Sequence, residues 1–225
     1  MKTSLQFTGL LALMLGALPA QDPDFVRDEV LAQMKWRSLG PVNFGGRVVD
    51  FAVDPGRPAT FYVATGSGGL FKTTNNGTSF TPIFEDEAVI SIGDIAIAPG
   101  DTDVLWLGTG EANNQRSSYW GNGVYKSVDA GKTWDHVGLD GTDHIGRIAA
   151  HPTDPDIAFV AALGCLYSSN EQRGLYRTRD GGESWERVAY VDENVGFVDV
   201  VIDPTHPDNV YAASYERRRR AHDFD

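Results

Sequence analysis

Short apolar runs alternate with breaks rich in Pro, Gly and Asp from residue 46 to residue 215. Four times, an apolar run ends at a proline-containing bend and a second apolar run follows. The four prolines, spaced by 44, 53 and 52 residues, are Pro55, Pro99, Pro152 and Pro204. Runs of Val, Ile and aromatic residues between such breaks predict antiparallel β-strands. The pattern therefore predicts four successive units that each begin with two strands.

A phrase of eight residues follows the predicted third strand in three units. It occupies residues 73–80, 127–134 and 178–185 and has the pattern Ser/Thr-x-Asp-x-Gly-x-Ser/Thr-aromatic, with Asn for Asp and Phe for Trp in the first copy. The Asp or Asn can accept hydrogen bonds from its own turn, the Gly permits positive φ, and the aromatic residue opens the next strand. These positions are Asn75, Gly77, Phe80, Asp129, Gly131, Trp134, Asp180, Gly182 and Trp185. The phrase predicts a structural hairpin turn, and a metal-binding or catalytic Asp is the alternative.

Units of four strands at a period near fifty residues are typical of β-propeller blades. We therefore predict an all-β fold with four-stranded antiparallel blades. The expected blades are about 46–84, 91–139 and 144–191, with a half blade at 196–215. Residues 35–40, which begin with Lys35 and Trp36, resemble an outermost strand without its blade. We expect an incomplete propeller whose missing C-terminal blades belong to the same polypeptide, and a short open array is the alternative.

The N-terminal residues have the features of an export signal. A basic start precedes an apolar stretch and small residues near residue 20, which predicts a signal peptide at 1–20. Residues 21–34 would form a linker or short helix before the propeller at 35–225. No other segment approaches ~18 continuous apolar residues, so no membrane span is expected. The expected location is the periplasm, the cell surface or the medium.

The net charge limits the classes of partner, and the cysteine content limits the possible disulfides. The net charge of −12 disfavours nucleic acid, because nucleic-acid binders present clustered positive charge. The basic run at 217–220 is interpreted as a solvated or locally paired face, with a recognition patch as the alternative. Cys165 is the single cysteine, so no internal disulfide can form. It is interpreted as a small packing residue.

The turn phrase resembles the Asp-box, or BNR repeat, of sialidases, xyloglucanases, photosystem II assembly-factor propellers and sortilins. A larger frame resembles secreted bacterial proteins described as sortilin N-terminal-like or BNR-repeat glycosyl-hydrolase-like. This frame consists of residues 36–41, 45–49, 64–73, 108–111, 144–148 and 161–164. The resemblance covers about residues 34 to 217 and implies a propeller. It does not fix an activity, since propellers host many functions.

Two enzyme patterns of this group can be tested on the residues. The Phe-Arg-Ile-Pro motif of sialidases is absent. Residues 62–69 align with the xyloglucanase motif Tyr-Ala-Arg-Thr-Asp-Ile-Gly-Gly, but Gly66 stands at the position of its catalytic base. Glycoside hydrolysis generally needs two carboxylates, and this pattern lacks the first. No other catalytic or cofactor motif is found, and residues 140–143 lack the spacing of a calcium loop. We therefore expect no cofactor and no metal.

Two expanded loops, 109–122 and 163–173, should lie on the face opposite the repeated turns. Long loops on a rigid scaffold are where binding residues concentrate. The predicted ligand-face residues are Glu111, Asn113, Asn114, Arg116, Tyr119, Trp120, Tyr167 and Arg173. Glu111 is the one weak catalytic candidate and alternatively anchors its loop, while Tyr119 and Trp120 alternatively pack against the blade. The sequence favours a non-catalytic exported scaffold that binds peptide, protein or polysaccharide. The alternative is a glycoside hydrolase-like enzyme.

Overall fold

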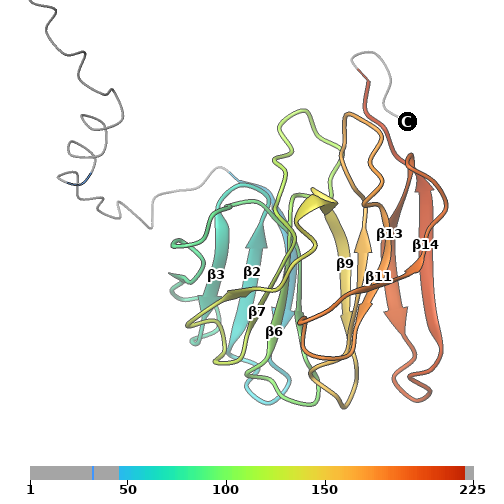
Figure 1. The fold of residues 1–225 in the computed structure, drawn as a ribbon. Helices are drawn as coiled ribbons and strands as arrows, with labels where there is room; N and C mark the ends of the chain where they lie inside the picture. The colour runs from blue at the N-terminus through green and yellow to red at the C-terminus, as the bar shows by residue number, and fades with distance from the viewer. Residues whose placement is uncertain (1–31, 33–45, 221–225) are drawn as a thin grey trace, which may run out of the picture. The chain divides into compact units, whose positions relative to one another are not determined.

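The computed structural model describes residue 32 and residues 46–220. The predicted signal peptide at 1–20, the predicted strand at 35–40 and all of the predicted linker except residue 32 lie outside the described residues. Residues 46–220 belong to one compact unit built from antiparallel β-sheets that stand side by side (Figure 1).

Three sheets have four strands each, and a fourth sheet has two. In chain order, their strands are β1 (Val48–Val53), β2 (Phe61–Thr65), β3 (Gly69–Thr73) and β4 (Thr81–Pro82); β5 (Ile92–Ile97), β6 (Leu105–Thr109), β7 (Val124–Ser127) and β8 (Asp135–His136); β9 (Ile145–Ala150), β10 (Ala158–Ala162), β11 (Gly174–Thr178) and β12 (Glu186–Ala189); and β13 (Val195–Ile202) with β14 (Val210–Glu216). Within each sheet, every strand pairs with the next one in sequence, so the four-stranded sheets are simple meanders. Within residues 46–220, the short 3-10 helix η1 (Asp140–Thr142) is the only helix. The predicted all-β fold of four-stranded antiparallel blades is confirmed.

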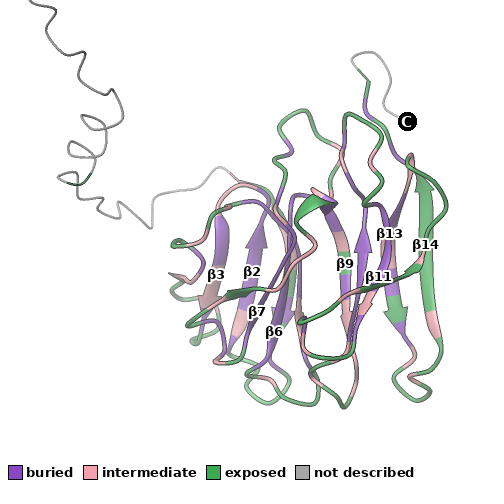
Figure 2. Cartoon of the chain, in the orientation of Figure 1, coloured by how far each residue is buried: buried purple, intermediate pink, exposed green. Residues whose placement is uncertain are grey.

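The core lies between the sheets, as expected when blades pack face to face. One apolar cluster joins the first and second blades, a second joins the second and third, and a third joins the third blade to β13 and β14. Trp106 is fully buried in the second cluster, edge-on to Trp185 with ring centroids 6.1 Å apart. Figure 2 shows mostly buried central strands, whereas β14 is largely exposed.

The repeated turns stabilise the blades in two ways. Within the turn, the Asp129 carboxylate accepts hydrogen bonds from the Thr133 amide at 2.9 Å and the Thr133 hydroxyl at 2.7 Å. Burial opposes ionisation of Asp129, but these bonds outweigh it and lower its pKa to about 2. Between blades, the Trp185 indole N–H donates to the Val137 carbonyl at 2.6 Å, directly after the outermost strand of the preceding blade. The turn therefore stabilises its own hairpin and also hydrogen-bonds its blade to the preceding blade.

One bulge recurs in all four innermost strands. In each, a single residue has no partner on the second strand of the blade; the four residues are Val49, Gly93, Gly146 and Val198. A bulge changes the direction of the side chain that follows it. In every blade that next residue is charged: Asp50, Asp94, Arg147 and Asp199.

These four charged side chains gather into one cluster, which we call the axial cluster. Arg147 lies 3.0 Å from Asp94, 3.3 Å from Asp199 and 3.9 Å from Asp50. Asp94 also accepts a hydrogen bond from the Ile148 amide of the next blade at 2.8 Å. Burial, followed by the neighbouring Asp50 carboxylate, raises the pKa of Asp94 to about 8. The innermost strands are therefore joined by hydrogen bonds of these side chains as well as by packing.

Candidate functional site

The two expanded loops join second to third strands, so they lie at the end of the blades opposite the repeated turns. One loop connects β6 to β7 and the other connects β10 to β11 (Figure 1). The Tyr167 hydroxyl of the second loop donates to the Arg116 carbonyl of the first at 3.2 Å. The two loops therefore form one continuous surface, which we call the loop face.

Glu111 lies beneath this surface and anchors the first loop. Its carboxylate is fully buried and accepts a bidentate pair of hydrogen bonds from Arg47, Nε at 2.6 Å and Nη2 at 2.5 Å. Asn113 Nδ2 adds a third bond at 3.2 Å. Burial alone would raise the pKa of Glu111, but the bonds from Arg47 and Asn113 outweigh it and hold that pKa below its usual value. Glu111 is thus an ionised, fully engaged carboxylate.

The Glu111 carboxylate also explains the glycine at position 66. A Cβ atom on Gly66 would lie 2.7 Å from Glu111 Cδ, closer than such atoms approach. The Ser91 hydroxyl bridges the same region, because it lies 2.9 Å from the Gly66 carbonyl and accepts a hydrogen bond from the Glu111 amide at 3.0 Å. The carboxylate of Glu111 therefore fills the space that a side chain at residue 66 would enter.

Three aromatic side chains on the loop face are open to solvent. Trp120 is 71% exposed, Tyr119 is 53% exposed and Tyr167 is 52% exposed. Large exposed rings held on ordered loops suit recognition of flat apolar surfaces, including sugar rings and peptide side chains. Asn113 and Arg116 are exposed beside them.

Arg173 belongs to the interior and not to the exposed surface. Arg173 is fully buried. Within residues 46–220, every hydrogen bond that its guanidinium donates goes to a main-chain carbonyl. The carbonyls belong to Leu163, Cys165, Ser168, Glu193 and Arg217. This side chain therefore shapes the second loop from within and is not available to a ligand.

Sequence reasoning missed several residues that build the site. Arg47 and Glu111 are 64 residues apart, and no local spacing pairs them. His144 is buried near them, and burial together with Arg217 lowers its pKa to about 4, so its ring is neutral at physiological pH. Arg217 and Arg219, expected in a solvated or locally paired face, are buried, whereas Arg218 and Arg220 are exposed. Four arginines in a row carry no signal in the sequence that separates the inward pair from the outward pair.

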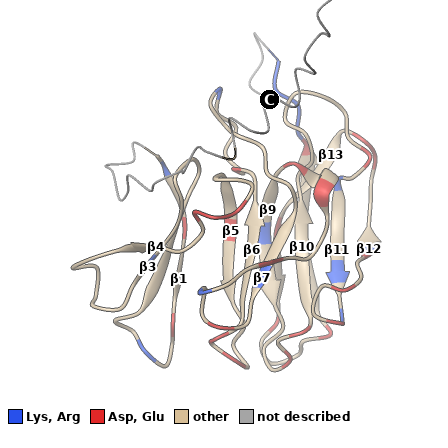
Figure 3. Cartoon of the chain, turned by 60° about the vertical axis from the view of Figure 1, so that its left-hand side comes forward, with Lys and Arg blue, Asp and Glu red and all other residues tan. Residues whose placement is uncertain are grey.

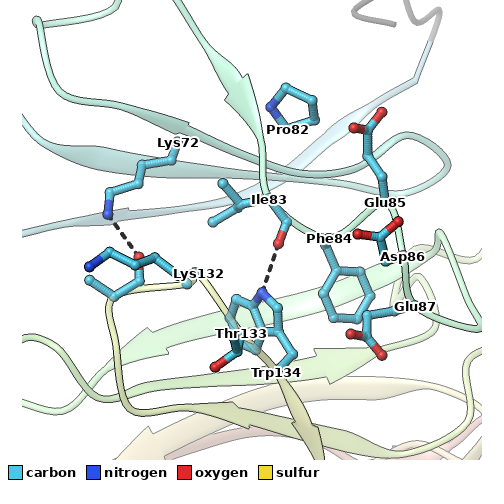
Figure 4. Close-up of a pocket in the computed structure, with 12 residues that line it drawn as sticks. Lys72, Pro82, Ile83, Phe84, Glu85, Asp86, Glu87, Lys132, Thr133 and Trp134 are labelled. Atoms are coloured by element: carbon cyan, nitrogen blue, oxygen red, sulfur yellow. Dashed lines mark hydrogen bonds between the residues drawn. The ribbon is translucent and has the colours of Figure 1, made fainter. Parts of the chain in front are cut away.

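A groove of about 390 Å³ lies elsewhere, between the first and second blades (Figure 4). The Trp134 indole N–H donates to the Ile83 carbonyl at 2.8 Å across it, and Lys72 Nζ donates to the Ala130 carbonyl at 2.8 Å. These bonds join the two blades, so the groove is part of the contact between them.

Across residues 46–220, no three His, Cys, Asp or Glu side chains are grouped to bind a metal ion. No helix in this part of the chain has the length and hydrophobicity to cross a membrane.

Comparison with known proteins supports the fold. No family model matches the chain. It is 24% identical over 187 residues to an oligoxyloglucan-reducing end-specific xyloglucanase of Emericella nidulans, which covers 76% of this chain and 22% of the relative. It is 26% identical over 152 residues to a probable enzyme of the same description from Neosartorya fischeri, covering 64% of this chain and 17% of the relative. The chain thus spans about a fifth of these relatives.

Solved structures give the same architecture. An ancestral GH74 enzyme matches with a TM-score of 0.60 and 24% identity, over 76% of this chain and 22% of that one. The GH74 xyloglucanase from Xanthomonas campestris matches with a TM-score of 0.57 and 20% identity, over 80% and 29% respectively. At these identities the likeness concerns the fold, and the fold defines a protein of the β-propeller class.

Proposed function

We propose that the chain is a binding propeller whose loop face takes up polysaccharide without hydrolysing it. The observation that carries this proposal is the set of three exposed rings, Tyr119, Trp120 and Tyr167, on two loops joined by a hydrogen bond. The similarity to xyloglucanases favours a glycan over a peptide or protein ligand. We further propose that the repeated turns are Asp-boxes of the sortilin N-terminal-like kind and that residues 1–20 direct export.

The geometry around Gly66 argues against hydrolysis by these residues. General acid–base chemistry on a glycosidic bond needs two carboxylates that reach the substrate, about 5–10 Å apart. Gly66 offers none, and Glu111 is buried under a bidentate Arg47 pair that would have to break first. An ionised carboxylate held by an arginine is also a weak base. Glu111 therefore acts as an anchor for the loop.

A second candidate function, glycan hydrolysis, is favoured by the xyloglucanase similarity alone. It would require an acid from outside residues 46–220, with Glu111 as its partner. Release of new reducing ends from xyloglucan oligosaccharides by the full chain distinguishes it from the binding function, with Glu111→Gln tested in parallel.

The binding function is tested by isothermal titration of the full chain with a panel of neutral and acidic polysaccharides and of peptides. Trp120→Ala should weaken glycan binding about tenfold, the typical cost of removing a central aromatic anchor. Tyr211→Ala is the matched control, because Tyr211 is 67% exposed on β14, away from the loop face. Binding that is lost equally in both variants, or seen with peptides only, would contradict the proposal.

A further inference from the structure

The basic run after β14 extends from blade to blade across the loop face. Arg217 Nη2 donates to the Ala112 carbonyl at 2.6 Å, and Arg219 Nη1 donates to the Asn114 carbonyl and to Asn114 Oδ1, the latter at 3.0 Å. Each contact joins residues 105 positions apart. Figure 1 shows the segment after β14 near the end of the blades that carries the loops, and Figure 3 shows basic residues in blue close to the C-terminal end of the described chain.

The main chain of this segment also crosses the third blade. The Arg219 amide donates to the Leu166 carbonyl at 2.7 Å, and Arg173 Nη2 donates to the Arg217 carbonyl at 2.9 Å. Residues 217–219, which we call the strap, therefore bind both expanded loops. The strap directly follows β14, its main chain contacts the loop of the third blade, and its two buried arginine side chains reach the loop of the second blade.

The part of the first loop that the strap contacts has few other ties to the blades. Residues 112–116 also form local hydrogen bonds: the Gln115 amide donates to the Asn113 carbonyl and to the Ser118 hydroxyl, the Ser118 amide donates to the Gln115 carbonyl, and Asn113 Nδ2 donates to Glu111. The carbonyls of Ala112, Asn114 and Arg116 accept instead from Arg217, Arg219 and Tyr167, side chains of other blades. A long loop whose internal hydrogen bonds are local is held in one place only if outside contacts offset its conformational entropy. The strap supplies two of those three contacts.

Charge makes these contacts strong and directional. Hydrogen bonds from a guanidinium to a neutral acceptor are stronger than those between two neutral groups. Arg219 uses one nitrogen on two oxygen atoms of Asn114, which fixes the main chain and the side chain of that residue together. Arg217 is fully buried, and its Nε and Nη1 have no hydrogen-bond partner among the described residues. Substitution of Arg217 would change the packing of the interior as well as the contact with Ala112. Arg219 therefore gives the clearer test.

We propose that Arg217 and Arg219 are positioning residues that hold residues 112–116 and thereby present Tyr119 and Trp120 to a ligand. The proposal rests on the proposed function for its ligand, but the ordering of the loop can be measured without one. The strap is thus a device by which the last described blade sets the shape of a surface on the second blade.

Amide hydrogen exchange of the full chain tests the strap. Arg219→Gln should raise exchange of the amides in 112–118 at least about tenfold, while Arg218→Gln, which removes an exposed charge from the same run, should leave it unchanged. Glycan titration should show the same order. Arg219→Gln should bind glycan about as weakly as Trp120→Ala does, and Arg218→Gln should bind it with the affinity of the parent protein.

The outcomes separate the two proposals. Unchanged exchange in 112–118 on Arg219→Gln would overturn the strap, whatever the ligand does. Faster exchange without any glycan binding by the parent protein would uphold the strap and refute the proposed function. Faster exchange with undiminished glycan binding would refute the positioning role, since the loop would then be free without loss of recognition.

Discussion

Asp94→Asn should change how stability depends on pH. Asp94 is buried in the axial cluster, and its pKa is raised from 3.8 to about 8. Folding therefore favours the protonated acid. The resulting stabilisation is complete below about pH 4 and is lost as pH rises towards about 8.

The magnitude follows from the number of protons bound. Where the folded state holds one proton that the unfolded state has released, stability falls by about 1.4 kcal/mol per pH unit. From about pH 5 to about pH 7 the loss is therefore about 3 kcal/mol at most. Asparagine resembles the protonated acid in shape, keeps an acceptor for the Ile148 amide, and has no proton to lose.

Urea unfolding followed by tryptophan fluorescence measures this dependence. His144, whose pKa is lowered to about 4, makes stability rise with pH up to about 6.5 and opposes this trend in both proteins. The stability of the parent protein relative to Asp94→Asn should therefore fall across that range. Asp199→Asn is the matched control, because Asp199 also contacts Arg147 but is half exposed, and the parent slope should remain. Equal slopes for the parent and Asp94→Asn would refute the reasoning.

Three further changes test the fold and the site. Trp185→Phe keeps a ring but removes the N–H donated to Val137, and should lower the unfolding free energy by about 1 kcal/mol. Gly66→Ala places a Cβ against Glu111 and should cost about 2 kcal/mol, with a lower thermal midpoint. Asp129→Asn should cost about 1 kcal/mol at neutral pH. Because the pKa of Asp129 is lowered to about 2, that difference should vanish as pH falls from about 4 to 2.

Controls for these variants come from the chain itself. Gly56→Ala should be nearly neutral, since a Cβ there meets Asp54 Oδ1 at an ordinary 3.4 Å. A Gly66→Ala protein as stable as Gly56→Ala would mean that Glu111 can move aside. Trp185→Phe without loss of stability would show that its hydrogen bond to the preceding blade is replaced by water, and an Asp129→Asn difference that persists at about pH 2 would contradict the assigned pKa.

Local patterns predicted the architecture because they recur in every blade. The prolines after the innermost strands and the phrase around Asp129 and Asp180 each lie within a few residues of the turns they form. Their spacing indicated four-stranded units, and that prediction is confirmed. The charged residue after each bulge can be read in the sequence. The position of the bulge, which sets the direction of that side chain, cannot.

The site could be predicted only in outline. The expanded loops follow from the spacing of strands, and the ligand-face residues remain a prediction. Which side chains turn inward depends on contacts between blades, such as Arg47 with Glu111 and Arg219 with Asn114. Such pairs leave no local periodicity. Arg173 was expected on the ligand face because it lies in an expanded loop, yet five main-chain carbonyls accept its hydrogen bonds inside the protein.

The most direct test of the account is a titration of the full chain with xyloglucan oligosaccharides, followed by analysis of the sugar recovered. We predict saturable binding that Trp120→Ala weakens about tenfold, with the oligosaccharides recovered intact. Cleaved oligosaccharides, or binding that is indifferent to Trp120, would contradict it.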